Sequence, residues 1–315
     1  MSSLATDRTA PLETMAVAPA LEYRGGSLPA RLDDLRQIVK PRISVMVLFT
    51  VGIGYGLGCQ GNWQSAVFFH ALLGVAAAAI ASSAINQYLE RFSDALMART
   101  ADRPLPEGRL APAAVLFFGL ICGTTAVIQL AVCVNILTAG LTLFSLVAYV
   151  ALYTPLKPRT SFGTVVGAIS GALPPVLGWT AAGGSLDASA AALFGILFLW
   201  QFPHFWAIAW LYRRQYAAAG LKMLPSVGSA RAVGVMATGY AVALIPLGVL
   251  PRQLGLAGDL YAGSALVLGL MYTAAALMFA VRGTDSAARR LLWISLIYLP
   301  GVLGILAFDH WRLLQ

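Results

Sequence analysis

Long apolar segments follow one another along the chain from residue 43 onward, separated by short polar or glycine-containing stretches. At about 1.5 Å of rise per residue, segments of this length cross the hydrocarbon core of a bilayer as α-helices. The pattern predicts nine transmembrane helices, at 43–58, 66–87, 112–130, 135–153, 162–182, 189–210, 232–250, 260–281 and 291–308. Because the connections are short, we expect one all-α bundle over residues 35–315, preceded by a disordered tail at 1–34.

Composition agrees with a membrane protein, since 59% of the residues are hydrophobic and only 11% are charged. Soluble domains carry about a quarter charged residues. The three cysteines, Cys59, Cys122 and Cys133, have no metal-binding or haem-attachment spacing. We interpret them as small apolar filler.

The distribution of basic residues predicts the orientation of the bundle. All of the 21 lysines and arginines except Arg252 and Arg312 lie in the N-terminal stretch or in the loops after the second, fourth, sixth and eighth helices. We therefore expect a cytoplasmic N-terminus. The first 42 residues hold no apolar signal core and are too acidic for a transit peptide, which favours a bacterial inner membrane. Nothing indicates nucleic acid as a partner.

Acidic residues are concentrated in one place. Only 13 occur in the chain, and four of them, Glu90, Asp94, Asp102 and Glu107, follow the second apolar segment directly. If that segment stays helical, Asn86, Glu90 and Asp94 are spaced i, i+4 and i+8 and share one face. Ionisable groups at a membrane boundary mark a functional site, and this one offers a row of hard oxygen ligands.

The predicted helices contain no Asp, Glu, Lys or Arg at bilayer depth, and this argues against an ion-coupled transporter. Carboxylates near basic loops suit a magnesium-chelated polyphosphate, because Mg²⁺ uses few protein carboxylates and shares phosphate oxygens. The adjoining apolar bundle predicts that the ligand's other half is a long hydrocarbon chain, as in a prenyl diphosphate. For the basic residues outside 86–105, orientation alone is an equally adequate explanation.

Several motifs carry a family resemblance. Asn86-x3-Glu90-x3-Asp94, followed by Met97-x-Arg99-Thr100-x-x-Arg103-Pro104-Leu105, resembles the signature of intramembrane UbiA-type prenyltransferases, whose fold has nine helices. Other motifs resemble the protohaem IX farnesyltransferases, or haem O synthases, within that superfamily. These are Lys40-Pro41-Arg42, Tyr153-Thr-Pro-Leu-Lys157 with Arg159-Thr160, Pro174-Pro175-x-x-Gly178-Trp179, Pro203-His204-Phe205-Trp206, Tyr216-x-x-Ala-Gly220-x-x-Met223-Leu224-Pro225 and Ser295-x-x-Tyr298-Leu299-Pro300.

The resemblance implies transfer of a farnesyl group from farnesyl diphosphate to the 2-vinyl group of haem b. Water supplies a hydroxyl, and the products are haem O and pyrophosphate. Asn86, Glu90 and Asp94 are then the catalytic residues and hold Mg²⁺. Partners would be both substrates, membrane lipid, and haem A synthase or oxidase assembly proteins. The expected diphosphate-binding residues are Lys40, Arg99, Arg103, Lys157, Arg159, Arg213, Arg214 and Lys222, and the expected haem or prenyl pocket comprises His204, Tyr153, Trp179, Phe205, Trp206 and Tyr216.

One departure from the family pattern concerns the loop between the sixth and seventh helices. Relatives usually carry an acid immediately before Tyr216, but here the position is Gln215, and Lys222 replaces a proline. We therefore hypothesise that one magnesium ion at Glu90 and Asp94 dominates.

Several alternatives remain open at this point. The other candidate functions are prenyl transfer to a quinone precursor or another lipid-soluble acceptor, a non-catalytic role in membrane assembly, and transport. The aromatic residues are either cation-stabilising walls or interfacial anchors. His204 either ligates haem or bonds a carbonyl freed by Pro203. Gly163, Gly167 and Gly171, followed by two prolines, predict a closely packed and kinked fifth helix.

Overall fold

The computed structural model describes residues 28–218, 220 and 229–315, and within these ranges it contains helices and no strands. The helices are α1 (Leu28–Val39), α2 (Pro41–Gly58), α3 (Ser65–Asp94), α4 (Pro112–Cys133), α5 (Ile136–Val147), the π-helical η1 (Ala148–Tyr153), α6 (Thr154–Leu156), α7 (Gly163–Ala172), α8 (Pro174–Ala181), α9 (Ala188–Leu211), α10 (Arg213–Ala218), α11 (Ala230–Gln253), α12 (Asp259–Arg282) and α13 (Asp285–Leu314).

Nine stretches of the described residues are long and apolar enough to cross a membrane, so the predicted all-α membrane fold is confirmed. The fourth span combines α5, η1 and α6, and the fifth combines α7 and α8. Two helices extend beyond their predicted ranges. α3 continues past 87 to Asp94, and α13 begins at Asp285 instead of 291. Hydropathy marks only the apolar part of a helix, whereas these ends carry charged residues beyond it.

The amphipathic helix α1 lies before the first span and is tied to the rest of the protein. Its Asp34 is buried and pairs with Arg109 at 2.8 Å. Gln87 of α3 donates to the Gln37 carbonyl at 3.2 Å. The domain boundary expected between residues 34 and 35 therefore falls inside a packed helix. The rest of the expected tail, residues 1–27, lies outside the described residues.

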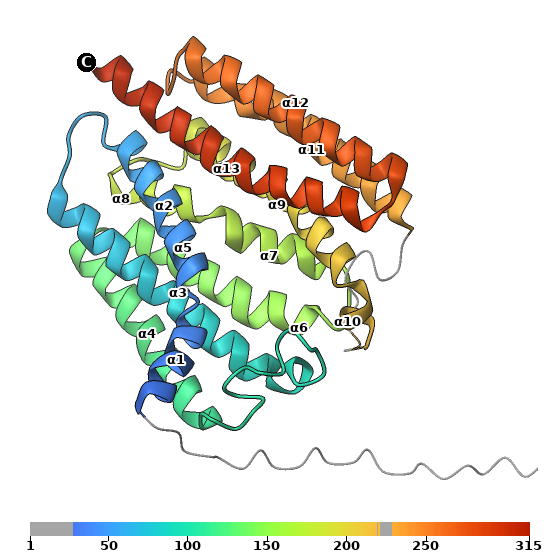
Figure 1. Cartoon of the computed structure of the whole chain (residues 1–315). Helices are drawn as coiled ribbons and strands as arrows, with labels where there is room; N and C mark the ends of the chain where they lie inside the picture. Colours follow the sequence, from blue (N-terminus) through green and yellow to red (C-terminus); the bar gives the residue numbers. More distant parts are fainter. Residues whose placement is uncertain (1–27, 219, 221–228) are drawn as a thin grey trace, which may run out of the picture.

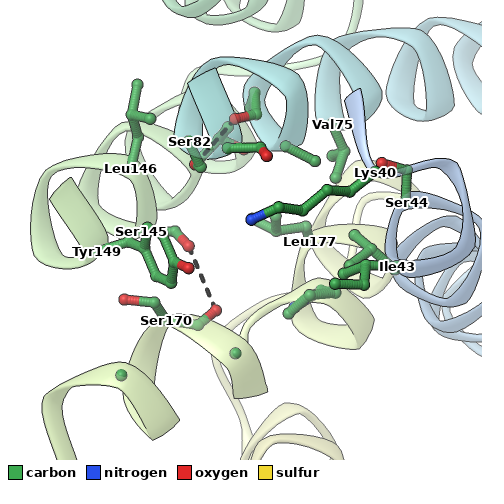
Figure 2. A pocket seen from close by; sticks show the side chains of 18 of the residues that line it. Lys40, Ile43, Ser44, Val75, Ser82, Ser145, Leu146, Tyr149, Ser170 and Leu177 are labelled. Atoms are coloured by element: carbon green, nitrogen blue, oxygen red, sulfur yellow. Dashed lines mark hydrogen bonds between the residues drawn. The ribbon is translucent and has the colours of Figure 1, made fainter. Parts of the chain in front are cut away.

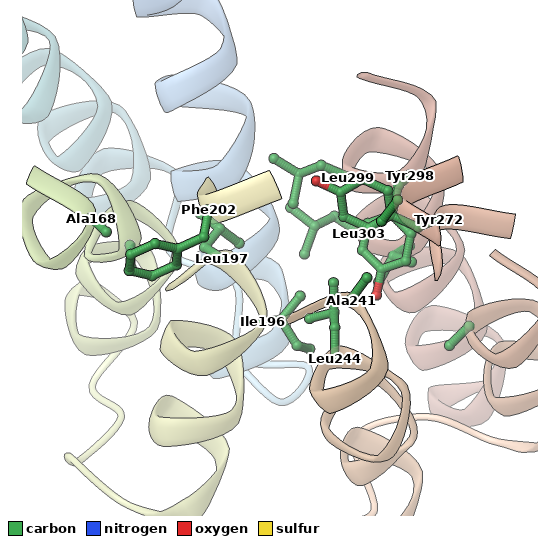
Figure 3. Close-up of a cluster of buried hydrophobic side chains, with 14 of the residues drawn as sticks. Ala168, Ile196, Leu197, Phe202, Ala241, Leu244, Tyr272, Tyr298, Leu299 and Leu303 are labelled. Atoms are coloured by element: carbon green, nitrogen blue, oxygen red, sulfur yellow. The ribbon is translucent and has the colours of Figure 1, made fainter. Parts of the chain in front are cut away.

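The first and second halves of the chain form two neighbouring groups of helices (Figure 1). α3 packs on α4, α2 packs on α8, and α12 packs on both α11 and α13. α9 contacts α7 on one side and α11 and α13 on the other. A large hydrophobic core follows α9, where Phe202, Leu244 and Tyr272 are fully buried (Figure 3). α9 thus forms the wall between this core and the first group of helices.

The fifth span is broken at Leu173, between α7 and α8, as the two prolines after it predict. After the break, α8 crosses α2, and the two backbones approach closely. A Cβ atom at Gly54 would collide with the Pro175 carbonyl, and one at Gly178 would collide with the Val51 carbonyl. Glycine at both positions allows the crossing, as small residues do elsewhere between membrane helices.

We expect Gly54→Val to destabilise the protein, because the new side chain meets backbone atoms that cannot move aside. Overpacking of this kind costs about 1–3 kcal/mol. The thermal midpoint of the detergent-solubilised protein measures the effect. Gly56→Val is the matched control, since a Cβ atom there meets nothing within 4 Å. Equal midpoints for the two variants would contradict the close crossing.

Candidate active site

The last two turns of α3 carry the predicted oxygen ligands on one face. Asn86 is buried, and its Nδ2 donates to Thr154 Oγ1 at 3.1 Å. Thr154 Oγ1 in turn donates to the Tyr149 carbonyl at 3.0 Å. These two hydrogen bonds fix the orientation of the Asn86 amide. Its oxygen accepts no hydrogen bond from any described residue. α3, η1 and α6 are therefore joined where the acidic row begins.

Glu90 pairs with Lys157, whose Nζ lies 2.6 Å from Glu90 Oε1. The same ammonium lies 4.5 Å from the centre of the Tyr153 ring. Burial alone would lower the pKa of Lys157, but Tyr153 and the Glu90 carboxylate outweigh it and raise the pKa above its usual value. Lys157 is therefore a cation at neutral pH, directly beside the first carboxylate.

Asp94 ends α3 and is almost completely buried. Arg103 Nη1 lies 2.5 Å from Asp94 Oδ2, and Thr100 Oγ1 donates to the Asp94 carbonyl at 2.9 Å. The loop after α3 folds back over the helix end because Met97 packs against Ala209 and Tyr216. Each carboxylate of the row thus faces its own cation from a different segment.

A cavity of about 400 Å³ opens between α2, α3, α5, η1, α7 and α9. Most of its wall is apolar, and Tyr149, Tyr153 and Phe205 contribute to it. Lys40 extends its side chain into the cavity from the junction of α1 and α2 (Figure 2). Its backbone is left-handed, with φ at 49°. Burial, together with the nearby charges of Arg103 and Lys157, lowers the pKa of Lys40 to about 8.

The structure brings only some of the predicted diphosphate-binding residues to this place. Arg103 and Lys157 are close enough to Lys40 for their positive charges to lower its pKa. Arg99 lies over the ring of Tyr212, 5.4 Å from its centre. Burial raises the pKa of Tyr216, and the positive charges of Arg99 and Lys157 oppose that rise.

The other predicted cations lie elsewhere. Arg213 pairs with Asp285 at 2.9 Å, at the start of α13. Arg159 and Arg214 are exposed. Lys222 lies outside the described residues. Orientation in the membrane is a sufficient reason for basic residues at those positions.

Four predicted pocket residues do not line the cavity. Tyr216 packs against Met97 and Ala209 instead. Trp179 donates to the Ser185 carbonyl at 2.9 Å, at the opposite end of the bundle. Trp206 faces Tyr240 of α11. His204 faces α13, where its Nδ1 lies 2.7 Å from Ser295 Oγ and its ring stacks on Trp200. Because Ser295 Oγ donates to the Leu292 carbonyl, it accepts from His204, and the free lone pair of His204 is on Nε2.

Sequence reasoning missed other polar residues of the cavity wall. Gln201 is buried in α9 one turn before Phe205, and Ser145, Tyr149 and Ser170 face the same space. A glutamine inside a long apolar span was the available signal, because a polar side chain at that depth faces the interior of the bundle.

Comparison with known proteins places these features in a family. The model of the UbiA prenyltransferase family matches residues 47–299. Among curated proteins, a protohaem IX farnesyltransferase of Solibacter usitatus is 42% identical over 287 residues, covering 88% of this chain and 98% of that protein. One of Myxococcus xanthus is 42% identical over 291 residues, covering 92% and 99%.

Solved structures share the fold at low sequence identity. A digeranylgeranylglyceryl phosphate synthase superposes with a TM-score of 0.77 at 15% identity, over 90% of this chain and 99% of that one. A UbiA homologue from Archaeoglobus fulgidus, bound to geranyl diphosphate (GPP) and Mg²⁺, gives a TM-score of 0.62 at 16% identity, over 87% and 99%. Fold, motif order and the length of the match agree, and the chain belongs to the UbiA prenyltransferase family.

Proposed function

We propose that this chain transfers a farnesyl group from farnesyl diphosphate to the 2-vinyl group of haem b, giving haem O and pyrophosphate. The observation that carries the proposal is a row of paired charges beside an apolar cavity. Glu90 pairs with Lys157 and Asp94 with Arg103, and Tyr153, whose ring lies against the Lys157 ammonium, lines the cavity. The curated relatives, which align over most of the chain, are named protohaem IX farnesyltransferases. Their names support farnesyl as the donor group and haem as the acceptor.

The residues present fit a magnesium ion. Among the described residues no group of three His, Cys, Asp or Glu side chains can hold a metal. Mg²⁺, however, is commonly held by one or two carboxylates, with substrate phosphates and water completing the shell. Glu90, Asp94 and the unpartnered oxygen of Asn86 are a donor set of that kind. When bound, the ion would neutralise charge on the leaving pyrophosphate.

The cations of the site stabilise the same developing charge. Breaking the bond between an allylic carbon and diphosphate leaves negative charge on the pyrophosphate, and preorganised cations lower the free energy of that state. Lys157 and Arg103 are already positioned beside the carboxylates. A diphosphate that binds there accepts hydrogen bonds from side chains that need little rearrangement. Lys40 approaches the same place from the cavity side.

The cavity takes the hydrocarbon part of the donor and keeps water from the allylic cation. Tyr153 and Phe205 line the wall, and aromatic faces stabilise a nearby cation by about 0.5–2 kcal/mol each. The Lys157 ammonium lies over the ring of Tyr153. Tyr153 therefore contacts both the charged residues and the apolar cavity. No side-chain nucleophile is required.

Topology and partners follow from the same proposal. We propose a bacterial inner membrane as its location, and the distribution of basic residues favours a cytoplasmic N-terminus. The active site then faces the cytoplasm, where a soluble diphosphate is available. Haem A synthase or an oxidase assembly protein is the expected receiver of the product.

We expect the affinity for inorganic diphosphate to lose the contribution of Lys40 as the pH rises. The pKa of Lys40 is lowered to about 8, so the ammonium that holds an anion is present below this pH and is lost above it. Titrations at pH 7 and pH 9 compare the wild type with Lys40→Met. The affinity ratio between the two proteins should shrink about tenfold, and an unchanged ratio would refute a direct role of Lys40.

The proposed activity is tested with purified protein, haem b, farnesyl diphosphate and magnesium. Chromatography and mass measurement should detect a farnesylated haem, and a coupled assay should detect an equal amount of pyrophosphate. Consumption of farnesyl diphosphate only when a quinone precursor replaces haem would assign the other acceptor. Haem binding without any consumption of farnesyl diphosphate would indicate a non-catalytic assembly factor.

A further inference from the structure

The apolar cavity is closed at one end. Val75 of α3 and Leu177 of α8 line it (Figure 2), yet each residue is only 3% exposed. Together with Val51 of α2, which is fully buried, they form one hydrophobic cluster. We call these three residues the floor cluster. Because almost none of their surface remains accessible, the cavity ends at them.

The break in the fifth span places the floor cluster. α7 lines the cavity with Gly167 and Gly171, and after the break at Leu173 the next helix, α8, crosses α2. At the crossing, the carbonyls of Val51 and Pro175 each occupy the space that a Cβ atom would need on the facing glycine. A hydrocarbon chain does not pass between two backbones that lie this close, so the crossing supports the floor cluster from behind.

One face of α3 runs from the floor cluster to the acidic row. Val75, Ala79 and Ser82 line the cavity. Asn86 and Glu90 follow at the same spacing of three or four residues on the unbroken helix. From Asn86 to Val75 the helix rises about 16 Å. This length separates the charged end of the site from the closed end of the cavity.

The depth of the cavity matches one length of prenyl chain. With the diphosphate at Glu90 and Asp94, carbon C1 of the prenyl group lies near Asn86, one turn closer to the floor cluster. With carbon–carbon bonds of about 1.5 Å, the main chain of an extended farnesyl group measures about 14 Å. A geranylgeranyl group is about 5 Å longer and would meet the floor cluster. A geranyl group is shorter by the same amount and would leave apolar wall without a partner.

We propose that the floor cluster selects the length of the donor, with Val75 and Leu177 as the residues that favour farnesyl diphosphate over its geranylgeranyl homologue; this inference rests on the proposed function. The selection is steric. A longer chain either folds back against the floor cluster or holds C1 away from the charged row. A shorter chain fits but loses its dispersion contacts with the floor cluster, so we expect it to be disfavoured less strongly.

The first test removes part of the floor cluster, in Leu177→Ala and Val75→Ala. The value of kcat/KM is measured with farnesyl or geranylgeranyl diphosphate, in the presence of haem b and magnesium. Wild type should prefer farnesyl diphosphate by about tenfold or more, and in both variants this preference should fall about tenfold. Val302→Ala is the matched control, because Val302 is a buried core residue of α13 that does not line the cavity. It should keep the wild-type preference.

The second test, Ala79→Phe, shortens the cavity instead. Ala79 lines the cavity one turn from Val75, on the side of the acidic row. Helical side chains lean toward the N-terminus of their helix, which for α3 is the end at the floor cluster. The new ring therefore takes the space of the farnesyl tail, and kcat/KM for geranyl relative to farnesyl diphosphate should rise about tenfold. This variant leaves the floor cluster intact, so it decides the matter where the truncated variants fail to fold.

Binding without haem separates this inference from the proposed function. Geranyl, farnesyl and geranylgeranyl diphosphate are each titrated with magnesium into every protein by calorimetry, and the affinities should follow the same order as kcat/KM. Equal affinity of wild type for farnesyl and geranylgeranyl diphosphate would overturn the inference, as would an unchanged preference in the three cavity variants. A wild type that selects farnesyl diphosphate in binding but prenylates no haem would refute the proposed function and leave the role of the floor cluster standing.

Discussion

Asp94→Asn and Glu90→Gln should each lower the rate of pyrophosphate release by about 100-fold or more, with the protein still folded. Both changes keep the size of the side chain and remove one negative charge. In the structure these charges face Arg103 and Lys157 at 2.5 and 2.6 Å, and they are the only carboxylates of the acidic row. Single-turnover assays over a range of magnesium concentrations measure the rate and its metal dependence.

Two neighbours provide controls for this prediction. Asp102 belongs to the same acidic stretch but is exposed and outside the row, so Asp102→Asn should behave as wild type. Gln215 replaces the acid of relatives, and its amide oxygen is buried without a partner among the described residues. If one magnesium ion dominates, Gln215→Ala should leave the magnesium dependence nearly unchanged. A large rise in its magnesium requirement would refute the one-ion hypothesis, and full activity in Asp94→Asn would refute the metal site.

The acidic row was predictable because it depends on one helix. Asn86, Glu90 and Asp94 share a face through local geometry alone, and the structure extends α3 far enough to include all three. The partners of the row were not predictable in the same way. Lys157 and Arg213 are both basic residues on neighbouring loops, yet only Lys157 reaches a carboxylate of the row, while Arg213 pairs with Asp285. Loop sequence does not specify that choice.

The residues of α9 that line the cavity were also not predictable from the sequence. α9 is apolar around its whole circumference, so periodicity does not show which face is inside. Motif resemblance selected His204, Phe205 and Trp206, but of these only Phe205 lines the cavity, together with Gln201, which the motifs did not select. The contacts of α9 with α7, α11 and α13 determine its rotation, and those contacts depend on the complete bundle. The break at Leu173, by contrast, follows from two adjacent prolines and was predicted correctly.

Lys157→Met should separate substrate binding from metal binding at the same carboxylate. The variant removes a cation from the site, so we expect kcat/KM for farnesyl diphosphate to fall about 10- to 100-fold. Lys157→Arg should recover part of the loss. Arg91→Met is the control, because Arg91 lies on α3 next to Glu90 but packs on Tyr88 and Phe92, and its activity should stay within about twofold of wild type.

Magnesium binding in the absence of diphosphate should change in the opposite direction. Lys157 lies beside Glu90, where a magnesium ion held by this carboxylate would also bind, so the lysine would compete with the ion unless a diphosphate accepted its hydrogen bonds. Removing the lysine relieves that competition, and Mg²⁺ alone should bind Lys157→Met at least as tightly as wild type. The coupling between Mg²⁺ and diphosphate, which by linkage is equal in both directions, should then weaken. Parallel loss of both affinities would show that Lys157 only maintains the fold, because a purely structural residue has no reason to affect the two ligands differently.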